Sequence, residues 1–357
     1  MDNVLLNKSE CSFLKGIAII FIILHNYCHE FPLAIEANEF HWIKGNILSF
    51  YNHLIHPSYY FISDFFSYWG HYGIVIFLFI SGYGLVMKYE QQSTPFLSNT
   101  YDFIKNHYLK LFYLMIWGFI ANMIANKLCT GYFFHDKWTI PGQLLFIINL
   151  IPNAHINPGP YWYLGMILQL YIIYIIIIAR ERDYSIYVLL GICILLQLFC
   201  NPDGEAIFWM RRNFIGCFLA FAIGIIVARH HIITYMRYSY FTSIMLIVIV
   251  FLCNFNFYLW LTAPLFIIPL SIQVTKACTC SKTVFLFFKK IGNLSSSIFI
   301  MHPIAHWLLL PSEDKRQYIY FYIILYFILS IFLGYIYSHF LICIKNGFTY
   351  NQNKHRN

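Results

Sequence analysis

Long runs of apolar residues recur along this chain of 357 residues, and they restrict its fold more than any other feature. Runs of roughly 18 residues or more occur from Phe13 to the neighbourhood of Ile344, and a helix needs about that length to cross the ~30 Å hydrocarbon core of a bilayer. Hydrophobic residues make up 60% of the sequence and charged residues only 11%, whereas an ordinary soluble domain has about 25% charged residues. No stretch between the runs is long enough for a separate globular domain. We therefore expect an all-α, polytopic integral membrane protein.

The first apolar run follows Lys8 and Lys15, as the apolar part of a signal peptide follows its basic residues. This run also contains His25 and lacks a small-x-small cleavage site, so we interpret it as a retained first span. The cysteines are scattered, with Cys278 and Cys280 as the only close pair, which does not match a zinc or disulfide framework. The net charge of +8 comes from dispersed basic residues, and this dispersal argues against a nucleic-acid-binding face.

Ten apolar runs are candidate membrane spans. They begin near Phe13, Tyr72, Tyr108, Tyr161, Tyr184, Asn213, Tyr238, Tyr258, Ile291 and Tyr318. A further segment from Ile140 to Ile151 is ambiguous, because about 12 residues is short for a span. Pro141 and Pro152 bracket it.

The distribution of Lys and Arg decides between ten and eleven spans. With ten spans and a cytoplasmic N-terminus, 16 of the 23 Lys and Arg residues lie in cytoplasmic segments, whereas counting the short segment as a span leaves only nine there. The positive-inside rule therefore predicts about ten spans with both termini in the cytoplasm. Residues 1–345 then form a transmembrane domain and residues 346–357 a short polar cytoplasmic tail. The 140–151 segment becomes an outside-facing or re-entrant piece.

Polar groups inside the hydrocarbon are costly, so the few that occur are functional candidates. Lys15 lies at the cytoplasmic end of the first span, and His25 follows ten residues later, at a depth of about 15 Å. His29 falls on nearly the same helix face one turn further on. Ser81 in the second span and His302 in the ninth reach a similar depth. Three spans thus bring polar groups to one level, as an intramembrane reaction site requires.

Each of these residues also has a purely structural interpretation. A lone intramembrane histidine such as His302 can simply hydrogen-bond a neighbouring helix. Ser81 beside Gly82 is typical of a close-packed helix pair, and no G-x-S-x-G elbow surrounds it. Trp162 and Tyr163, at the outer end of the fourth span, suit an aromatic belt at the membrane interface as well as contacts to a ligand.

Four segments follow one another along nearly the whole chain: KGIAIIFIILH, FLFISGYGL, YWYLG and IGNLSSSIFIMHPI. Together they resemble the acyltransferase 3 family, bacterial membrane O-acyltransferases, in its stand-alone form without a C-terminal esterase-like domain. The family usually places a basic residue eleven positions before its histidine, whereas Lys15 precedes His25 by ten and Asn26 occupies the expected position. One residue is about 100° on a helix, so the family's histidine role could fall to His25 or to His29.

The resemblance implies an enzyme that moves an acyl group, normally acetyl, from cytoplasmic acyl-CoA to a hydroxyl of an extracytoplasmic sugar or surface polysaccharide. Acyl-CoA is then a co-substrate, and no permanently bound cofactor or metal is implied. The catalytic candidates are His25, His302 and Ser81. The candidates for binding CoA are Lys15, Lys110 and Lys105. The candidates for binding the acceptor are His29, Trp162 and Tyr163.

In that reaction His25 would act as general base toward the acceptor hydroxyl or carry the acyl group itself, and the sequence leaves both routes open. The implied location is the bacterial cytoplasmic (inner) membrane, with no nucleic-acid partner. One alternative is a transporter or flippase component for a lipid-linked glycan, in which the same polar residues line a permeation path. A second alternative is a non-catalytic partner of a polysaccharide synthase. We find no inverted repeat of broken helices to support a transporter.

Overall fold

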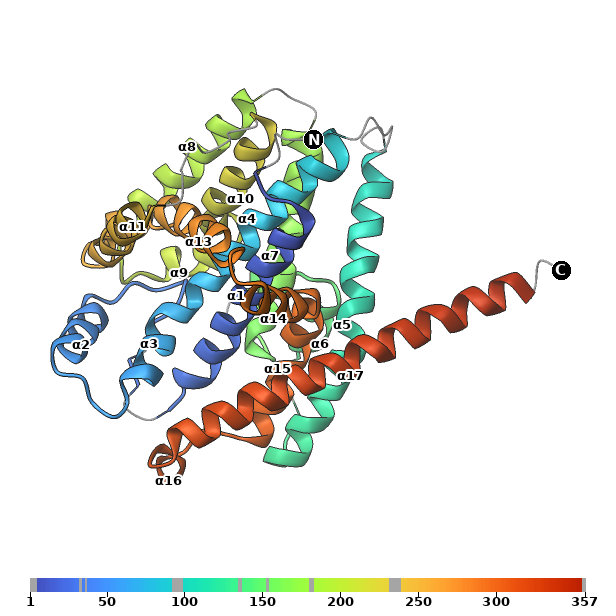
Figure 1. The fold of residues 1–357 in the computed structure, drawn as a ribbon. Coiled ribbons are helices and arrows are strands. Elements are labelled where there is room, and N and C mark those ends of the chain that lie inside the picture. The colour runs from blue at the N-terminus through green and yellow to red at the C-terminus, as the bar shows by residue number, and fades with distance from the viewer. Residues whose placement is uncertain are drawn as a thin grey trace.

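The computed structural model describes residues 5–31, 34–35, 37–91, 99–133, 137–151, 154–179, 183–230 and 239–354, with side chains described up to residue 346. All regular elements in these ranges are helical, and the ranges contain no strand, which confirms the all-α class (Figure 1). Four basic residues of the charge count lie outside the described residues: Arg180, Arg182, Arg237 and Arg356. Below, the cytoplasmic and outer ends of helices are named as the positive-inside rule assigns them.

A helical element corresponds to each of the ten expected spans. The seven that are long and apolar enough to cross a membrane are α1 (Lys8–Cys28), Phe61–Glu90, α5 (Thr100–Thr130), Gly159–Ile178, Glu205–Arg229, Lys282–Leu308 and Ile319–Asn346. The three shorter apolar helices are α8 (Tyr184–Leu198), α11 (Tyr240–Cys253) and α13 (Pro264–Cys278).

Several of these spans consist of consecutive helices. The second contains α3 (Phe61–Trp69), η1 (Gly70–Tyr72), α4 (Gly73–Leu85) and η2 (Val86–Glu90). The fourth contains η5 (Gly159–Tyr161), α7 (Trp162–Ile173) and η6 (Tyr174–Ile178). The sixth contains α9 (Glu205–Arg211) and α10 (Phe214–Arg229), and the ninth contains α14 (Lys282–Asn293) and α15 (Ser295–Leu308). The last belongs to α17 (Ile319–Lys354), and the short connecting helices are α2 (Lys44–Ile55), α12 (Phe257–Trp260) and α16 (Glu313–Arg316).

Helix α1 runs through the middle of the bundle and packs against α14, α3, α4, α15 and α17 (Figure 1). Its start is well defined, because Asn7 and Glu10 form a reciprocal capping box. Glu10 also pairs with Lys276 at the cytoplasmic end of α13, with Nζ and Oε1 2.6 Å apart. Gly16 and Gly292 allow the backbones of α1 and α14 to touch, since a Cβ on either would collide with the other helix.

The 140–151 segment does not cross the bundle. It forms α6 (Thr139–Leu144) and η4 (Ile148–Leu150), and the hydroxyl of Tyr108 on α5 donates to the Leu144 carbonyl at 3.0 Å. Tyr108 lies about 12 Å along α5 from its cytoplasmic end, so the segment penetrates deeply from the outer side. Thr139 donates to the His155 carbonyl at 2.9 Å, which joins the segment's entry to its exit. This is the geometry of a re-entrant segment.

The cytoplasmic ends of three spans are tied together by one arginine. Arg229, at the end of α10, binds Glu90 through Nε at 2.7 Å and Nη2 at 2.8 Å, and Asp183 at 3.3 Å. Tyr174, at the start of η6, donates to the same Glu90 carboxylate at 2.7 Å. These bonds anchor η2, the π-helical turn that carries Lys88.

Candidate functional site

Two cavities open into the bundle from opposite ends. The outer cavity, of about 800 Å³, is lined by the outer ends of α1 and α15, the 38–40 loop and the segment before α7. The inner cavity, of about 1030 Å³, is lined by α1, α4, η2, α5, α7, α15 and α17. The first holds the predicted His25, His29 and His302, and the second holds Lys15 and Ser81.

The two cavities approach each other near the middle of the bundle. On α1, Ile22 lines the inner cavity and His25 the outer one. On α15, Phe299 lines the inner cavity and His302 the outer one. Three residues cover about 4.5 Å of a helix axis, so less than one helical turn separates the two cavities on both helices.

His25 is held from two sides in a defined orientation. Its Nδ1 lies 2.9 Å from the Ser67 carbonyl oxygen on α3, and its ring stacks on His29 with centroids 4.8 Å apart. Gly70 packs against it so closely that an added Cβ would lie 2.6 Å from the His25 Cβ. Because a carbonyl can only accept, Nδ1 of His25 carries the proton and Nε2 has the free lone pair. The Nε2 atom of neutral His25 is therefore able to accept a proton.

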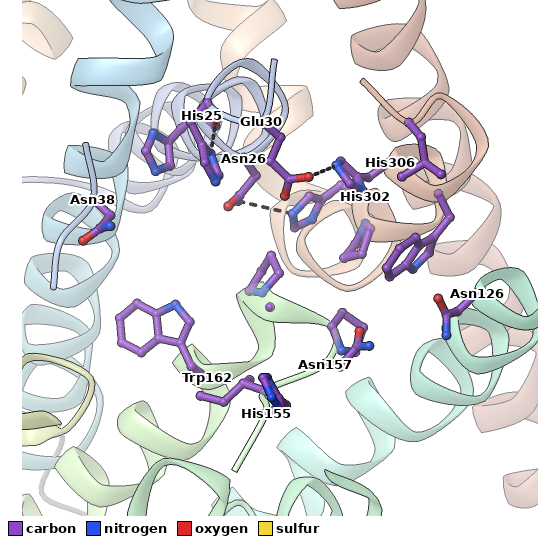
Figure 2. Close-up of a pocket in the computed structure, with 18 of the residues that line it drawn as sticks. His25, Asn26, Glu30, Asn38, Asn126, His155, Asn157, Trp162, His302 and His306 are labelled. Carbon is purple, nitrogen blue, oxygen red and sulfur yellow. Dashed lines mark hydrogen bonds and ion pairs between the residues drawn. The ribbon is translucent and has the colours of Figure 1, made fainter. Parts of the chain in front are cut away.

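His302 is oriented in the same way from α15. Its Nδ1 lies 2.8 Å from the Phe299 carbonyl oxygen, which again leaves the lone pair on Nε2. The amide nitrogen of Asn26 approaches this Nε2 at 3.4 Å and links α1 to α15 across the outer cavity (Figure 2). Nε2 of neutral His302 thus accepts a hydrogen bond from the side-chain amide of Asn26.

Two acidic groups of the outer cavity differ in their ionisation. Glu30 pairs with His306 at 2.8 Å (Figure 2). Burial alone would raise the pKa of Glu30, but the hydrogen bond and charge of His306 outweigh it and lower the pKa below its ordinary value. Burial raises the pKa of Glu39 to about 7, although the charges of Arg211 and Arg212 act in the opposite direction. The cavity therefore holds one firmly ionised carboxylate and one that titrates near neutrality.

The remaining wall of the outer cavity combines aromatic rings with amides. Trp162 meets Phe40 edge to face, with centroids 4.7 Å apart. Asn38, Asn126 and Asn157 also line the cavity, and Figure 2 shows them spread around its edge. Rings that stack on apolar faces and amides that bond hydroxyl groups are the usual partners of a polar ligand in a pocket.

The inner cavity is cationic. The basic residues that line it are Lys15, Lys88, Lys110, Lys345 and His107, and its described lining contains no carboxylate side chain. Lys105, predicted to help bind CoA, does not line either cavity; it is exposed on α5, with Nζ 5.7 Å from the Tyr101 ring centre. The structure thus brings Lys15 and Lys110 together and leaves Lys105 apart from them.

Ser81 and Tyr163 lie on the inner side of the boundary. Ser81 sits beside the hydroxyl groups of Tyr163 and Tyr171. Both Ser81 and Tyr163 line the inner cavity, whereas Trp162, the neighbour of Tyr163, lines the outer one. Ser81 is therefore separated from the cavity that holds His25.

Sequence reasoning did not select Lys88, His107 or Asn26 as site residues. Lys88 follows the second span and His107 precedes Lys110 by one helical turn, so counting polar residues from the cytoplasmic ends would have found both. The contact of Asn26 with His302 joins positions 276 residues apart and has no local sequence signal.

The long apolar helices are those of a multi-pass membrane protein. Its bundle has a histidine-lined cavity at one end and a lysine-lined cavity at the other, so the two cavities differ in chemistry. The family model of the acyltransferase 3 domain, described as an acyltransferase domain, matches residues 11–339, nearly the whole chain. The chain therefore belongs to the acyltransferase 3 family and is a membrane acyltransferase. No curated protein and no solved structure matches it.

Proposed function

We propose that this acyltransferase moves an acyl group, normally acetyl, from cytoplasmic acyl-CoA to a hydroxyl of an extracytoplasmic sugar or surface polysaccharide, in the cytoplasmic membrane of a bacterium. The close approach of the two cavities carries this proposal. A donor in the inner cavity and an acceptor in the outer one would approach each other beside His25 and His302. The reacting groups could then meet without either substrate crossing the membrane.

The charge of the inner cavity supports a polyanionic donor. Lys15, Lys88 and Lys110 offer ammonium groups to the phosphates of CoA, and no lining carboxylate among the described residues opposes them. Apolar side chains such as Leu111 and Trp117 cover much of the remaining wall, which suits the less polar arm that ends in the thioester.

The tautomer of His25 supports a role for this residue as general base. Its Nε2 takes the proton of the acceptor hydroxyl while that oxygen attacks the thioester carbonyl carbon. A C–O bond forms, the C–S bond breaks, and the leaving CoA thiolate receives the proton from Nε2. The side-chain amide of Asn26 makes only a long contact with His302, at 3.4 Å, so it is free to donate a hydrogen bond to the oxyanion that develops on the thioester carbonyl. A route through an acyl-histidine would use the same lone pair and add one intermediate.

Mass spectrometry of surface glycan tests the proposal in cells. The strains are wild type, a deletion strain, and the deletion strain carrying His25→Gln at normal expression. We expect the glycan to be made in full in all three, and its acyl group to be present only in wild type. Loss of the glycan itself in the deletion strain would point instead to the flippase alternative. Full acylation by His25→Gln would refute the assignment of the base.

A further inference from the structure

Aromatic side chains line the inner cavity on the side where it comes closest to the outer one. Phe77, Tyr163 and Phe299, here called the aromatic wall, all line the inner cavity. Tyr163 meets Phe299 edge to face with centroids 5.5 Å apart and lies 6.4 Å from Phe77. The Phe299 ring is 5.8 Å from the ring of His302, which lines the outer cavity. An acyl group that moves from the inner cavity to the histidines must therefore pass the aromatic wall.

The helix that carries Phe299 cannot easily move aside. Gly118 of α5 packs against Ile300, and a Cβ at Gly118 would overlap that side chain. On the opposite side, a Cβ at Gly334 of α17 would lie 2.5 Å from the Ile298 side chain and 2.9 Å from its Cα. Helix α15 is therefore held between two neighbours at distances that only glycine permits. The space available at the aromatic wall is set by its side chains.

The inner cavity itself does not limit the size of the donor's acyl group. Its volume of about 1030 Å³ leaves room for a long chain, and much of its lining is apolar. The restriction arises where the thioester carbonyl must come within about 3–3.5 Å of the attacking oxygen. In that position the acyl tail of the donor would lie beside the side chain of Phe299, a residue that is only 8% exposed.

We propose that Phe299, packed against Tyr163, limits the acyl group of the donor to a very short chain. An acetyl group has to fit only one methyl group beside the Phe299 ring. Propionyl and butyryl groups have additional methylene groups, which fit only if the ring is displaced. This inference rests on the proposed function and adds no reactant to it: the C–O bond forms and the C–S bond breaks as described above. It assigns donor selectivity to Phe299, and the chemical step to His25.

The test compares donors on the purified full chain in lipid nanodiscs. The acceptor source is the envelope fraction of a deletion strain, and the donors are acetyl-, propionyl- and butyryl-CoA labelled in the acyl group. The readout is the butyryl-to-acetyl ratio of kcat/KM, in which any general loss of activity cancels. We expect Phe299→Ala to raise this ratio by about tenfold or more, since one methylene in a fitted pocket changes selectivity by roughly 10- to 200-fold. Phe299→Leu should raise it less.

The matched control is Phe218→Ala on α10. Phe218 is fully buried but lines neither cavity, so we expect the wild-type ratio. If Phe299→Ala and Phe299→Leu keep the wild-type ratio, or lose all donors in equal proportion, the inference is overturned while the proposed function stands. If the wild-type protein transfers none of the three acyl groups, the proposed function fails and this inference fails with it.

Discussion

Replacing Gly70 with alanine is expected to displace His25 without touching the chemistry of any side chain. An alanine Cβ at this position would lie 2.6 Å from the His25 Cβ and 2.5 Å from the Phe21 carbonyl oxygen. Carbon atoms in ordinary contact are about 3.5–4.0 Å apart, so α1 and η1 must separate by about 1 Å. A displacement of that size at a reacting group can cost about 100-fold in rate, while overpacking costs about 1–3 kcal/mol of stability.

The assay measures kcat for acetyl transfer together with the unfolding temperature of the purified protein. Gly191→Ala on α8 is the control, because no atom lies within 4 Å of the added Cβ. We predict a kcat about 100-fold below that of Gly191→Ala, with a folded protein that binds acetyl-CoA normally. A Gly70→Ala enzyme as active as the control would refute the reasoning that links His25 position to rate.

Three further predictions concern charged groups. Lys88 lines the inner cavity, so Lys88→Ala should raise the KM for acetyl-CoA about fivefold, the equivalent of about 1 kcal/mol. Lys105 does not line it, so Lys105→Ala should raise the KM much less. Steady-state kinetics at low salt compare the two variants. Burial raises the pKa of Glu39 from 4.5 to about 7, so between these two pH values the folded state binds more protons than the unfolded state, and stability falls as the pH rises through this range. Glu39→Gln should remove this decline, measured as unfolding temperature from pH 4.5 to 8; an unchanged pH profile would contradict it. Glu90→Gln should lower stability by about 2 kcal/mol, because Arg229 loses its main partner; thermal unfolding measures this change.

The order of the apolar helices followed from the sequence, and in the described part of the chain seven of the ten expected spans have the length that the hydrocarbon thickness imposes. The sequence also predicted one common depth for His25, Ser81 and His302, since a helix rises by a fixed amount per residue. Of these, His25 and His302 line one cavity together with His29, whereas Ser81 lines the other. Lys15 and Lys110 likewise line the other.

Depth along an axis does not determine the direction in which a side chain points. Ser81 lies at the predicted level yet faces the inner cavity, because the rotation of α4 about its axis depends on packing with other helices. The same holds for Tyr163 and Trp162, adjacent residues that line different cavities. The contact between Asn26 and His302 depends on the crossing of two distant helices, which no local pattern specifies. The orientation of the site therefore required the structure.

The sidedness of the donor tests the central claim most directly. Inside-out and right-side-out membrane vesicles from the same cells would each receive acetyl-CoA labelled in the acetyl group, and label in the glycan would be counted. The account predicts labelling in inside-out vesicles, almost none in right-side-out vesicles, and none in either with His25→Gln. Equal labelling in both orientations would contradict transfer between a cytoplasmic donor cavity and an outer acceptor cavity.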